Sequence, residues 1–201
     1  MIAARHFNKK YYHDKGIGYD ENTSFYSKVN WDELASGLKN TYKTILNKRL
    51  NSFFDAGCAK GYLVNEMIKK GVNAKGIDIS KFAISEAPQE VKPFIRCGSL
   101  TDCRIGKVDM VRAYGTLHYL NEKELTAFIK KCSKVSVLNI GQFPLGDDKE
   151  TIRLWHKLDK IPKLCKRFDW WCNLIMKEGW VLDTLKYPDG DIDCYFVNRN
   201  S

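Results

Sequence analysis

Short apolar runs alternate with helical patterns through the middle of the chain. The runs occupy residues 53–54, 74–79, 94–97, 108–113 and 135–140. Between them, apolar residues recur every three or four positions, as in residues 63–68 and 125–129, which is typical of amphipathic helices. Strands that alternate with helices form βαβ units and a parallel sheet covered on both faces. The middle of the chain therefore predicts a doubly wound α/β fold.

The two ends of the chain carry different patterns. Residues 1–30 are rich in aromatic side chains, which disordered segments lack, so they predict an ordered arm. Residues 31–50 have the spacing of a leading amphipathic helix. Residues 180–187 and 192–198 predict two strands joined by the turn formers of residues 188–191, and strands linked so closely must be antiparallel.

The composition is that of one globular domain. The 201 residues include 44% apolar residues, enough for one sizeable core, and no linker-like segment divides them. We expect a single domain over residues 1–201, with a core at residues 51–141, inserted helices at 142–178 and a terminal hairpin at 179–201. The chain lacks an apolar run of about 18 residues and a secretory apolar block, so we expect no membrane span and a cytoplasmic protein.

Charge and cysteine usage narrow the chemistry further. The seven cysteines show no paired spacing, so we expect reduced thiols and no metal site. The net charge is +9, and residues 151–177 hold seven Lys or Arg against two Asp. An anionic partner for that region is one interpretation, and a solvated basic helix face is the other.

The candidate binding motif follows the first predicted strand, at residues 55–61 (Asp-Ala-Gly-Cys-Ala-Lys-Gly). Small residues there let the backbone turn sharply beside a ligand, and ligands of open α/β sheets bind at this edge. Asp78 ends the second run, where its carboxylate can accept hydrogen bonds from ribose hydroxyls. The dinucleotide pattern GxGxxG fails, because Ala59 and Tyr62 replace its second and third glycines. The motif therefore favours a nucleoside ligand without a pyrophosphate.

Four segments, taken in their order along the chain, together resemble the motifs of class I S-adenosylmethionine-dependent methyltransferases. They are residues 54–61, 76–80, 98–100 and 108–120, within a resemblance that covers about residues 53–141. The resemblance implies an enzyme with a mostly parallel, seven-stranded sheet that ends in an antiparallel hairpin. It also implies S-adenosylmethionine as the methyl donor and S-adenosylhomocysteine as the product.

The resemblance also implies the cofactor contacts. They are assigned to Asp55, Gly57, Cys58, Ala59, Gly61, Asp78, Ile79, Ser99, Leu100 and Tyr114. Asp55 and Gly57 would lie near the methionine end, and Asp78 at the ribose. Ile79, Ser99 and Leu100 would contact the adenine, and Tyr114 would lie close to the sulfonium. Cys58 is interpreted as a small packing residue of the turn.

The chain departs from the family pattern at two of these positions. Ala59 stands where the family often has Gly, and Ser99 stands where it often has an acidic residue. Asp102 could replace the missing acidic contact, although a solvated loop carboxylate is the alternative interpretation.

Methyl transfer from a sulfonium is an in-line displacement, so a base is needed only where the acceptor must lose a proton. His118, after the fourth predicted strand, is the candidate base, and a supporting role at a helix start is the alternative. His13 is a second candidate. The arm is expected to form a lid over the site, or to pack on the sheet edge. Its lid residues are Tyr11, Tyr12, His13 and Tyr19.

We expect the acceptor to be an oxygen or nitrogen atom of a small molecule, such as a saccharide or another metabolite. One alternative is an RNA or DNA methyltransferase that uses the basic residues 151–177. The chain lacks the Asn-Pro-Pro-Tyr or Asp-Pro-Pro-Tyr and Pro-Cys sequences of two such classes. The other alternative is a non-catalytic binding protein of the same fold. The oligomeric state is left open.

Overall fold

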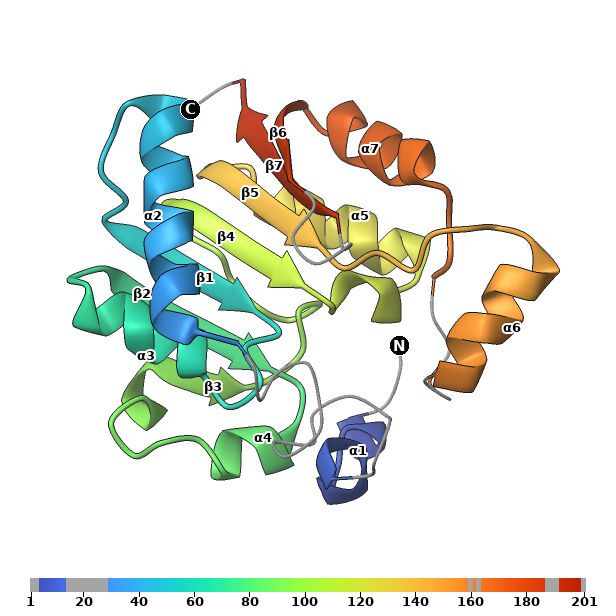
Figure 1. Ribbon diagram of the computed structural model, residues 1–201, viewed down its shortest axis with the longest axis horizontal. Helices are drawn as coiled ribbons and strands as arrows, with labels where there is room; N and C mark the ends of the chain where they lie inside the picture. Colours follow the sequence, from blue (N-terminus) through green and yellow to red (C-terminus); the bar gives the residue numbers. More distant parts are fainter. Residues whose placement is uncertain (1–3, 14–28, 159–160, 162–163, 187–191, 200–201) are drawn as a thin grey trace.

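A seven-stranded sheet forms the centre of the computed structural model (Figure 1). The structure describes residues 4–13, 29–158, 161, 164–186 and 192–199. The strands are β1 (Ser52–Ala56), β2 (Asn73–Asp78), β3 (Ile95–Cys97), β4 (Val108–Tyr114), β5 (Val135–Gly141), β6 (Trp180–Lys186) and β7 (Asp193–Asn198). Their order is β3-β2-β1-β4-β5-β7-β6. Strands β1 to β5 are parallel, and β7 is antiparallel to both β5 and β6.

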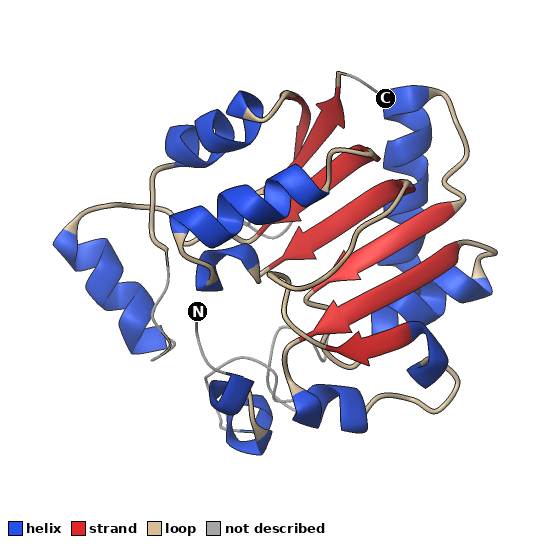
Figure 2. Cartoon of the chain, turned by 180° about the vertical axis from the view of Figure 1, so that it is seen from behind, coloured by secondary structure: helices blue, strands red, loops and turns tan. Residues whose placement is uncertain are grey.

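Helices cover both faces of this sheet. The helices of the described residues are η1 (Ala4–His6), α1 (Lys9–His13), α2 (Trp31–Leu46), α3 (Tyr62–Lys69), α4 (Lys81–Ser85), η3 (Lys92–Phe94), η4 (Leu117–Tyr119), α5 (Glu122–Lys131), α6 (Lys149–Leu158) and α7 (Phe168–Lys177). Figure 1 shows α2 and α3 in front of the sheet, and the reverse view of Figure 2 shows α5 and α7 on the opposite face.

The predicted doubly wound α/β fold with a terminal antiparallel hairpin is confirmed. The leading helix is shorter than expected: α2 ends at Leu46, because Asn47 adopts a left-handed conformation (φ 51°) that terminates it. The turn predicted at residues 188–191 lies outside the described residues. No helix in the described part of the chain is long and apolar enough to cross a membrane.

The core consists of two main layers, one on each face of the sheet. Strand side chains alternate, so Phe53 packs toward α2 and α3 while its neighbour Phe54 packs toward α5 and α7. The α5–α7 layer includes the fully buried Phe128 and Trp171. The terminal strand β7 contributes to both layers, and its Tyr195 packs on the α2–α3 side.

Asp109, which lies within the methyltransferase-like segments, belongs to the amino end of the sheet. Its Oδ2 accepts hydrogen bonds from the backbone N–H groups of Asn51 (2.8 Å) and Ser52 (2.9 Å). This carboxylate therefore ties the start of β1 to β4, at the edge opposite to the predicted binding motif.

Candidate functional site

The candidate site lies at the carboxyl ends of β1 and β4, where the order of the strands reverses. From β1 the chain continues to β2 and β3 on one side, whereas β4 leads to β5 on the other side. Such a switch point leaves a crevice for ligands in open α/β sheets. Asp55, Asp78 and Tyr114 all lie at or next to this edge.

The turn after β1 has the backbone geometry that its small residues permit. Gly57 (φ 91°) and Gly61 (φ 76°) are left-handed, and Gly61 precedes the first residue of α3. A Cβ atom at Gly57 would lie 2.6 Å from Thr116 Oγ1, so the turn packs tightly on the loop after β4. Ala59 is also left-handed (φ 48°), which is unfavourable for a residue with a Cβ atom. Ala59 therefore takes the place of the family's Gly at the cost of backbone strain.

Asp78 joins the turn to the end of β2. Its Oδ2 accepts a hydrogen bond from the Ala59 N–H (2.8 Å), and its Oδ1 accepts one from the Ser80 N–H (2.8 Å). Burial raises the pKa of Asp78, whereas the two backbone hydrogen bonds lower it. A carboxylate has about four acceptor positions, so two remain for hydroxyl groups of a ligand.

Asp55 is the least satisfied buried carboxylate of the site. Its side chain is buried, with the residue 7% exposed, and it forms no hydrogen bond with any residue that the structure describes. Burial raises the pKa of Asp55 to about 7, while Arg112 lowers it and Asp78 raises it further. Its oxygens keep some solvent contact, since Trp171 Nε1 is the one fully buried polar side-chain atom without a partner among the described residues. Asp55 is therefore a candidate for contact with a cationic group of a ligand.

A row of polar side chains crosses the sheet beside Asp55. Arg112 on β4 is the register partner of Asp55, and Asn139 on β5 is the register partner of Arg112. The guanidinium donates to Asn139 Oδ1 and to Asp193 Oδ1 (3.4 Å). Asn139 Nδ2 also donates to Asp193 Oδ1 (2.6 Å), and the Tyr195 hydroxyl donates to Asp193 Oδ2 (3.1 Å).

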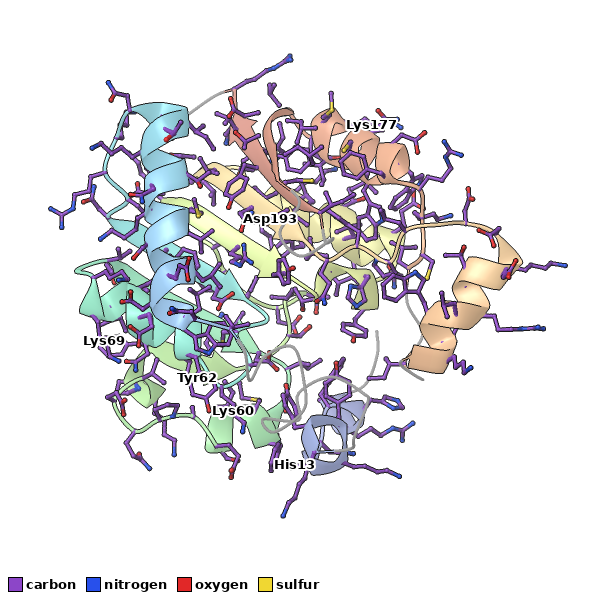
Figure 3. The ribbon with its side chains drawn as sticks, viewed as in Figure 1. His13, Lys60, Tyr62, Lys69, Lys177 and Asp193 are labelled. Carbon is purple, nitrogen blue, oxygen red and sulfur yellow. The ribbon has the colours of Figure 1, made fainter. Side chains whose placement is uncertain are left out.

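Tyr114 belongs to the same row. The Arg112 guanidinium lies 4.4 Å from the centre of the Tyr114 ring, in a cation–π arrangement. On β5, a Cβ atom at Gly141 would come within 2.6 Å of that ring, so Gly141 makes room for it. Asp193, labelled in Figure 3, starts β7 at this edge of the sheet.

The predicted adenine contacts lie on the loop after β3 and at the start of α4. Ser99 Oγ lies 2.9 Å from Thr101 Oγ1 and accepts from the Thr101 N–H (3.2 Å), so it stabilises the loop itself. Lys131 Nζ donates to the carbonyl oxygens of Leu100 (3.4 Å) and Thr101. Asp102, the alternative contact, is exposed.

Ile79 and Cys58 are placed differently. Ile79 packs against an aromatic cluster of the arm, whereas Cys58 is buried in the turn. A Cβ atom at Gly76 would lie 2.7 Å from Cys58 Cβ, so the thiol fills space between the turn and β2.

The arm packs on the turn and on α4. Tyr12 is buried in a cluster with Ala59 and Ala83, and the Ser80 hydroxyl donates to the Phe7 carbonyl oxygen (2.5 Å). Tyr11 and His13 also lie on α1, where the His13 ring is 5.5 Å from that of Phe82. Tyr19 lies outside the described residues.

His118 is buried in η4, after the loop that packs on Gly57. Its carbonyl oxygen accepts a hydrogen bond from the Leu164 N–H (2.7 Å), and its ring centre lies 4.2 Å from that of Tyr119. The Tyr119 and Tyr11 hydroxyl oxygens are 3.0 Å apart. The loop after β4 is therefore linked to the arm through its tyrosine.

Sequence reasoning missed the row formed by Arg112, Asn139 and Asp193. A signal was present, since an arginine inside the apolar run of residues 108–113 predicts a buried charge that needs a partner. The partner could not be named, because Asp193 lies 81 residues further along the chain.

The comparisons with known proteins agree with this geometry. A family model described as a methyltransferase domain matches residues 53–137, which hold the turn, Asp78 and β4. The matched segment is similar to methyltransferase domains, and the chain has the fold of class I S-adenosylmethionine-dependent methyltransferases. The matched segment carries all ten predicted cofactor contacts.

Solved structures share the fold of this chain. An S-adenosylmethionine-dependent methyltransferase from Clostridium acetobutylicum aligns with a TM-score of 0.67 at 11% identity, over 89% of this chain and 96% of that chain. Magnesium protoporphyrin IX methyltransferase from Synechocystis, crystallised with S-adenosylhomocysteine, aligns at 0.66 and 16% identity over 94% and 97% of the two chains.

A third structure is an O-methyltransferase of neocarzinostatin biosynthesis in complex with S-adenosylmethionine and 2-hydroxy-5-methyl naphthoic acid. It aligns with a TM-score of 0.59 at 13% identity, over 92% of this chain and 65% of that chain. No curated protein matches this chain in a sequence comparison. At these identities, the structural likeness establishes the fold and leaves the acceptor open.

Proposed function

We propose that this methyltransferase moves the methyl group of S-adenosylmethionine to an oxygen or nitrogen atom of a small molecule. The observation that carries the proposal is the junction of the glycine turn with Asp78, where the Ala59 N–H donates to the Asp78 carboxylate. This junction places a buried carboxylate with spare acceptor positions beside a tight turn at the switch point of the sheet.

The residues present fit S-adenosylmethionine at both ends of the molecule. Asp78 would accept hydrogen bonds from the ribose hydroxyls. Asp55, which has no hydrogen bond in the described part of the chain, would accept from the α-ammonium of the methionine moiety. Burial raises the pKa of Asp55 to about 7 despite the nearby Arg112, so a cationic group of the ligand would stabilise the ionised carboxylate.

The remaining cofactor contacts follow from their positions in the fold. Gly57, Cys58, Ala59 and Gly61 would bring the turn close to the methionine end, and Tyr114 would lie beside the sulfonium. Ile79, Ser99 and Leu100 would line the adenine end. The Lys131 ammonium supports this role, because it holds the carbonyl groups of the loop at Leu100 and Thr101.

When bound, S-adenosylmethionine would supply an activated methyl group, so the chain needs to align the acceptor and exclude water. We assign exclusion of water to the arm, where Tyr11, Tyr12 and His13 lie on a helix packed against the turn. Tyr19 would extend this lid. His118 is proposed to take the proton of a hydroxyl or amine acceptor, from the loop that follows β4.

The small-molecule acceptor is supported by the kinds of enzyme that share the fold. They include a magnesium protoporphyrin IX methyltransferase and an O-methyltransferase crystallised with a naphthoic acid. The segment between β5 and β6 holds α6 and α7. Figure 1 shows α6 at the side of the molecule toward which β4 and β5 point, whereas α7 packs on the sheet face with α5. We infer that residues 142–178 shape the acceptor pocket.

The proposal is tested by calorimetric titration with S-adenosylhomocysteine. The Asp78→Asn substitution places an amide where two backbone N–H donors require acceptors, so we expect affinity to fall about 100-fold. Asp183→Asn is the matched control, because Asp183 is an exposed carboxylate on β6, away from the turn and Asp78, and the affinity of this variant should stay within about twofold of the native value. An unchanged affinity in Asp78→Asn would contradict the assignment of the ribose site.

A nucleic-acid acceptor is the second candidate, and the surface of α6 supports it. Lys149, Arg153 and Lys157 are exposed at four-residue spacing, and Lys166 lies 5.5 Å from the ring centre of Trp170. Such a basic row can contact phosphates. Binding of RNA or DNA that weakens steeply with added salt, and that Arg153→Gln with Lys157→Gln reduces, would favour this candidate over a small molecule.

A further inference from the structure

Arg112 has a carboxylate on each side of it in the sheet, Asp55 and Asp193. It forms its ion pair with Asp193, the one whose strand is not a direct neighbour of β4. Asp55 is its register partner on the neighbouring strand β1, whereas Asp193 lies on β7, with β5 between them. The guanidinium nevertheless makes its ion pair with Asp193 (3.4 Å). No ion pair joins Arg112 to Asp55 within the described residues, although both side chains are buried on the same face of the sheet.

Asn139 completes this arrangement. Its Oδ1 accepts from Arg112, and its Nδ2 donates to Asp193 Oδ1 (2.6 Å). Tyr195 donates to the other oxygen of Asp193, so the orientation of that carboxylate is fixed from both sides. The guanidinium is therefore held toward β7 by a carboxylate and an amide that are themselves held in place.

We propose that Asp193 and Asn139 are positioning residues, which hold the Arg112 guanidinium away from Asp55 and so keep the Asp55 carboxylate available for the α-ammonium of the cofactor. This inference rests on the proposed function, because it concerns how the same site binds its methyl donor. It assigns part of cofactor affinity to the terminal hairpin, far from the glycine turn in the sequence.

The electrostatics around Asp55 are consistent with this role. The charged and titratable groups that act on it are Arg112 on β4, Asp78 after β2 and Cys58 in the turn. Only Arg112 among these three can be positive. With that guanidinium shared with Asp193, the buried Asp55 and Asp78 lack a full counter-charge, which a cationic ligand would supply.

The test compares two ligands on the intact protein. S-adenosylhomocysteine carries the α-ammonium, whereas methylthioadenosine has the same nucleoside and sulfur without the amino-acid moiety. In Asp193→Asn, the guanidinium loses its carboxylate partner and pairs with Asp55. We expect affinity for S-adenosylhomocysteine to fall about tenfold, and affinity for methylthioadenosine to stay within about twofold.

The pH profile gives a second readout, which a purely structural role would not change. In the native protein, affinity for S-adenosylhomocysteine should decrease as the pH falls from 8 to 5, by about tenfold or more, because Asp55 becomes protonated. In Asp193→Asn this dependence should flatten, because Arg112 then keeps Asp55 ionised. Methylthioadenosine should bind with no such dependence in either protein.

Two further variants keep the test decisive. Asp183→Asn is the matched control, since Asp183 is an exposed carboxylate on the neighbouring strand β6, and neither ligand should be affected. Asn139→Ala keeps both charges and loosens the hold on Arg112, so it tests the idea even where Asp193→Asn does not fold. We expect about a threefold, ligand-selective loss in that variant.

The outcomes separate the two proposals. If Asp193→Asn lowers the affinity for both ligands equally, or for neither, the positioning role is overturned. Binding of S-adenosylhomocysteine by the native protein would still support the proposed methyl-donor site. A native protein that binds neither ligand would instead refute the proposed function.

Discussion

The two faces of the central sheet are built from different chemistry. On the α5–α7 face, strand side chains such as Val111, Leu138 and Phe196 are apolar and buried against the helices. On the α2–α3 face, the same strands bury Asp55, Arg112 and other polar groups toward the carboxyl edge. Adjacent residues of one strand therefore have different roles, since one side chain packs in the apolar core and the next belongs to the row of polar side chains on the other face.

This difference shows where the fold carries an energetic cost. Apolar packing stabilises the folded state without the need for partners, whereas each buried charge requires a counter-charge or a hydrogen bond. The α5–α7 face has one unsatisfied donor among the described residues, Trp171 Nε1. The α2–α3 face has Asp55, a charged group that the fold leaves without a hydrogen bond in the part of the chain that the structure describes.

Among substitutions on the polar face, we expect Arg112→Met to lower the free energy of unfolding the most. The substitution keeps the apolar stem and leaves two buried carboxylates without a cation, so the free energy of unfolding at pH 8 should fall by about 3–5 kcal/mol. Urea denaturation measures the loss. Arg167→Met is the control, because Arg167 and Asp169 form an exposed pair, and it should cost less than about 1 kcal/mol. Equal losses in the two variants would show that burial of the pair is irrelevant.

The polar face should also make stability depend on pH. Because the pKa of Asp55 is raised in the folded state from 3.8 to about 7, the folded protein binds the extra proton and its stability should decrease as the pH rises between these values. The decrease from Asp55 amounts to roughly 4 kcal/mol as an upper limit. Urea denaturation of unliganded protein at pH 5 and pH 8 tests this.

The matching variant for the pH experiment is Asp55→Asn, which has no proton to lose. The difference between the variant and the native protein should grow in favour of the variant from pH 5 to pH 8. A constant difference across that range would mean that Asp55 is already ionised in the folded protein at pH 5.

On the apolar face, Leu125→Ala should cost about 3 kcal/mol, because it removes a fully buried side chain of α5 and leaves a cavity. Unlike the Asp55 effect, this loss should be the same at pH 5 and pH 8. Leu154→Ala is the control, since Leu154 on α6 is 55% exposed and its truncation should change stability by less than about 0.5 kcal/mol. A pH-dependent loss of stability in Leu125→Ala would contradict the expectation that only the polar face makes stability depend on pH.

The smallest expected effect concerns Trp171. Replacing it with Phe removes an indole N–H that has no hydrogen-bond partner, so relief of that unsatisfied donor offsets much of the lost packing. We expect a change within about 1 kcal/mol in urea denaturation. A loss above about 2 kcal/mol would indicate that the N–H is satisfied in solution, for example by a buried water.

Much of the fold was predictable because its signals are local. The apolar runs predicted every boundary of β1 to β5 to within two residues, and the turn formers at residues 188–191 predicted that the last two strands are antiparallel. The turn at residues 55–61 and Asp78 were found from spacing, and the structure joins them by the hydrogen bond from the Ala59 N–H. Their contacts with the cofactor stay predictions.

The long-range contacts of the site could not be predicted, because the order of the strands in the sheet brings together residues that are far apart in the sequence. Asn139 meets Asp193 across 54 residues, and Phe7 meets Ser80 across 73. No local pattern specifies that β7 enters between β5 and β6, or that the arm packs on the turn. The end of α2 was missed because Asn47, which carries no strong stop signal by itself, adopts a left-handed conformation.

The insertion of β7 between β5 and β6 also fixes an order of assembly during translation. Strands β4 and β5 leave the ribosome well before β7, so a nascent chain holds Arg112 without its carboxylate and exposes the unpaired edge of β5. Docking of β7 closes that edge and completes the charged row in one event. A chain that ends before β7 is therefore expected to be the form most open to aggregation.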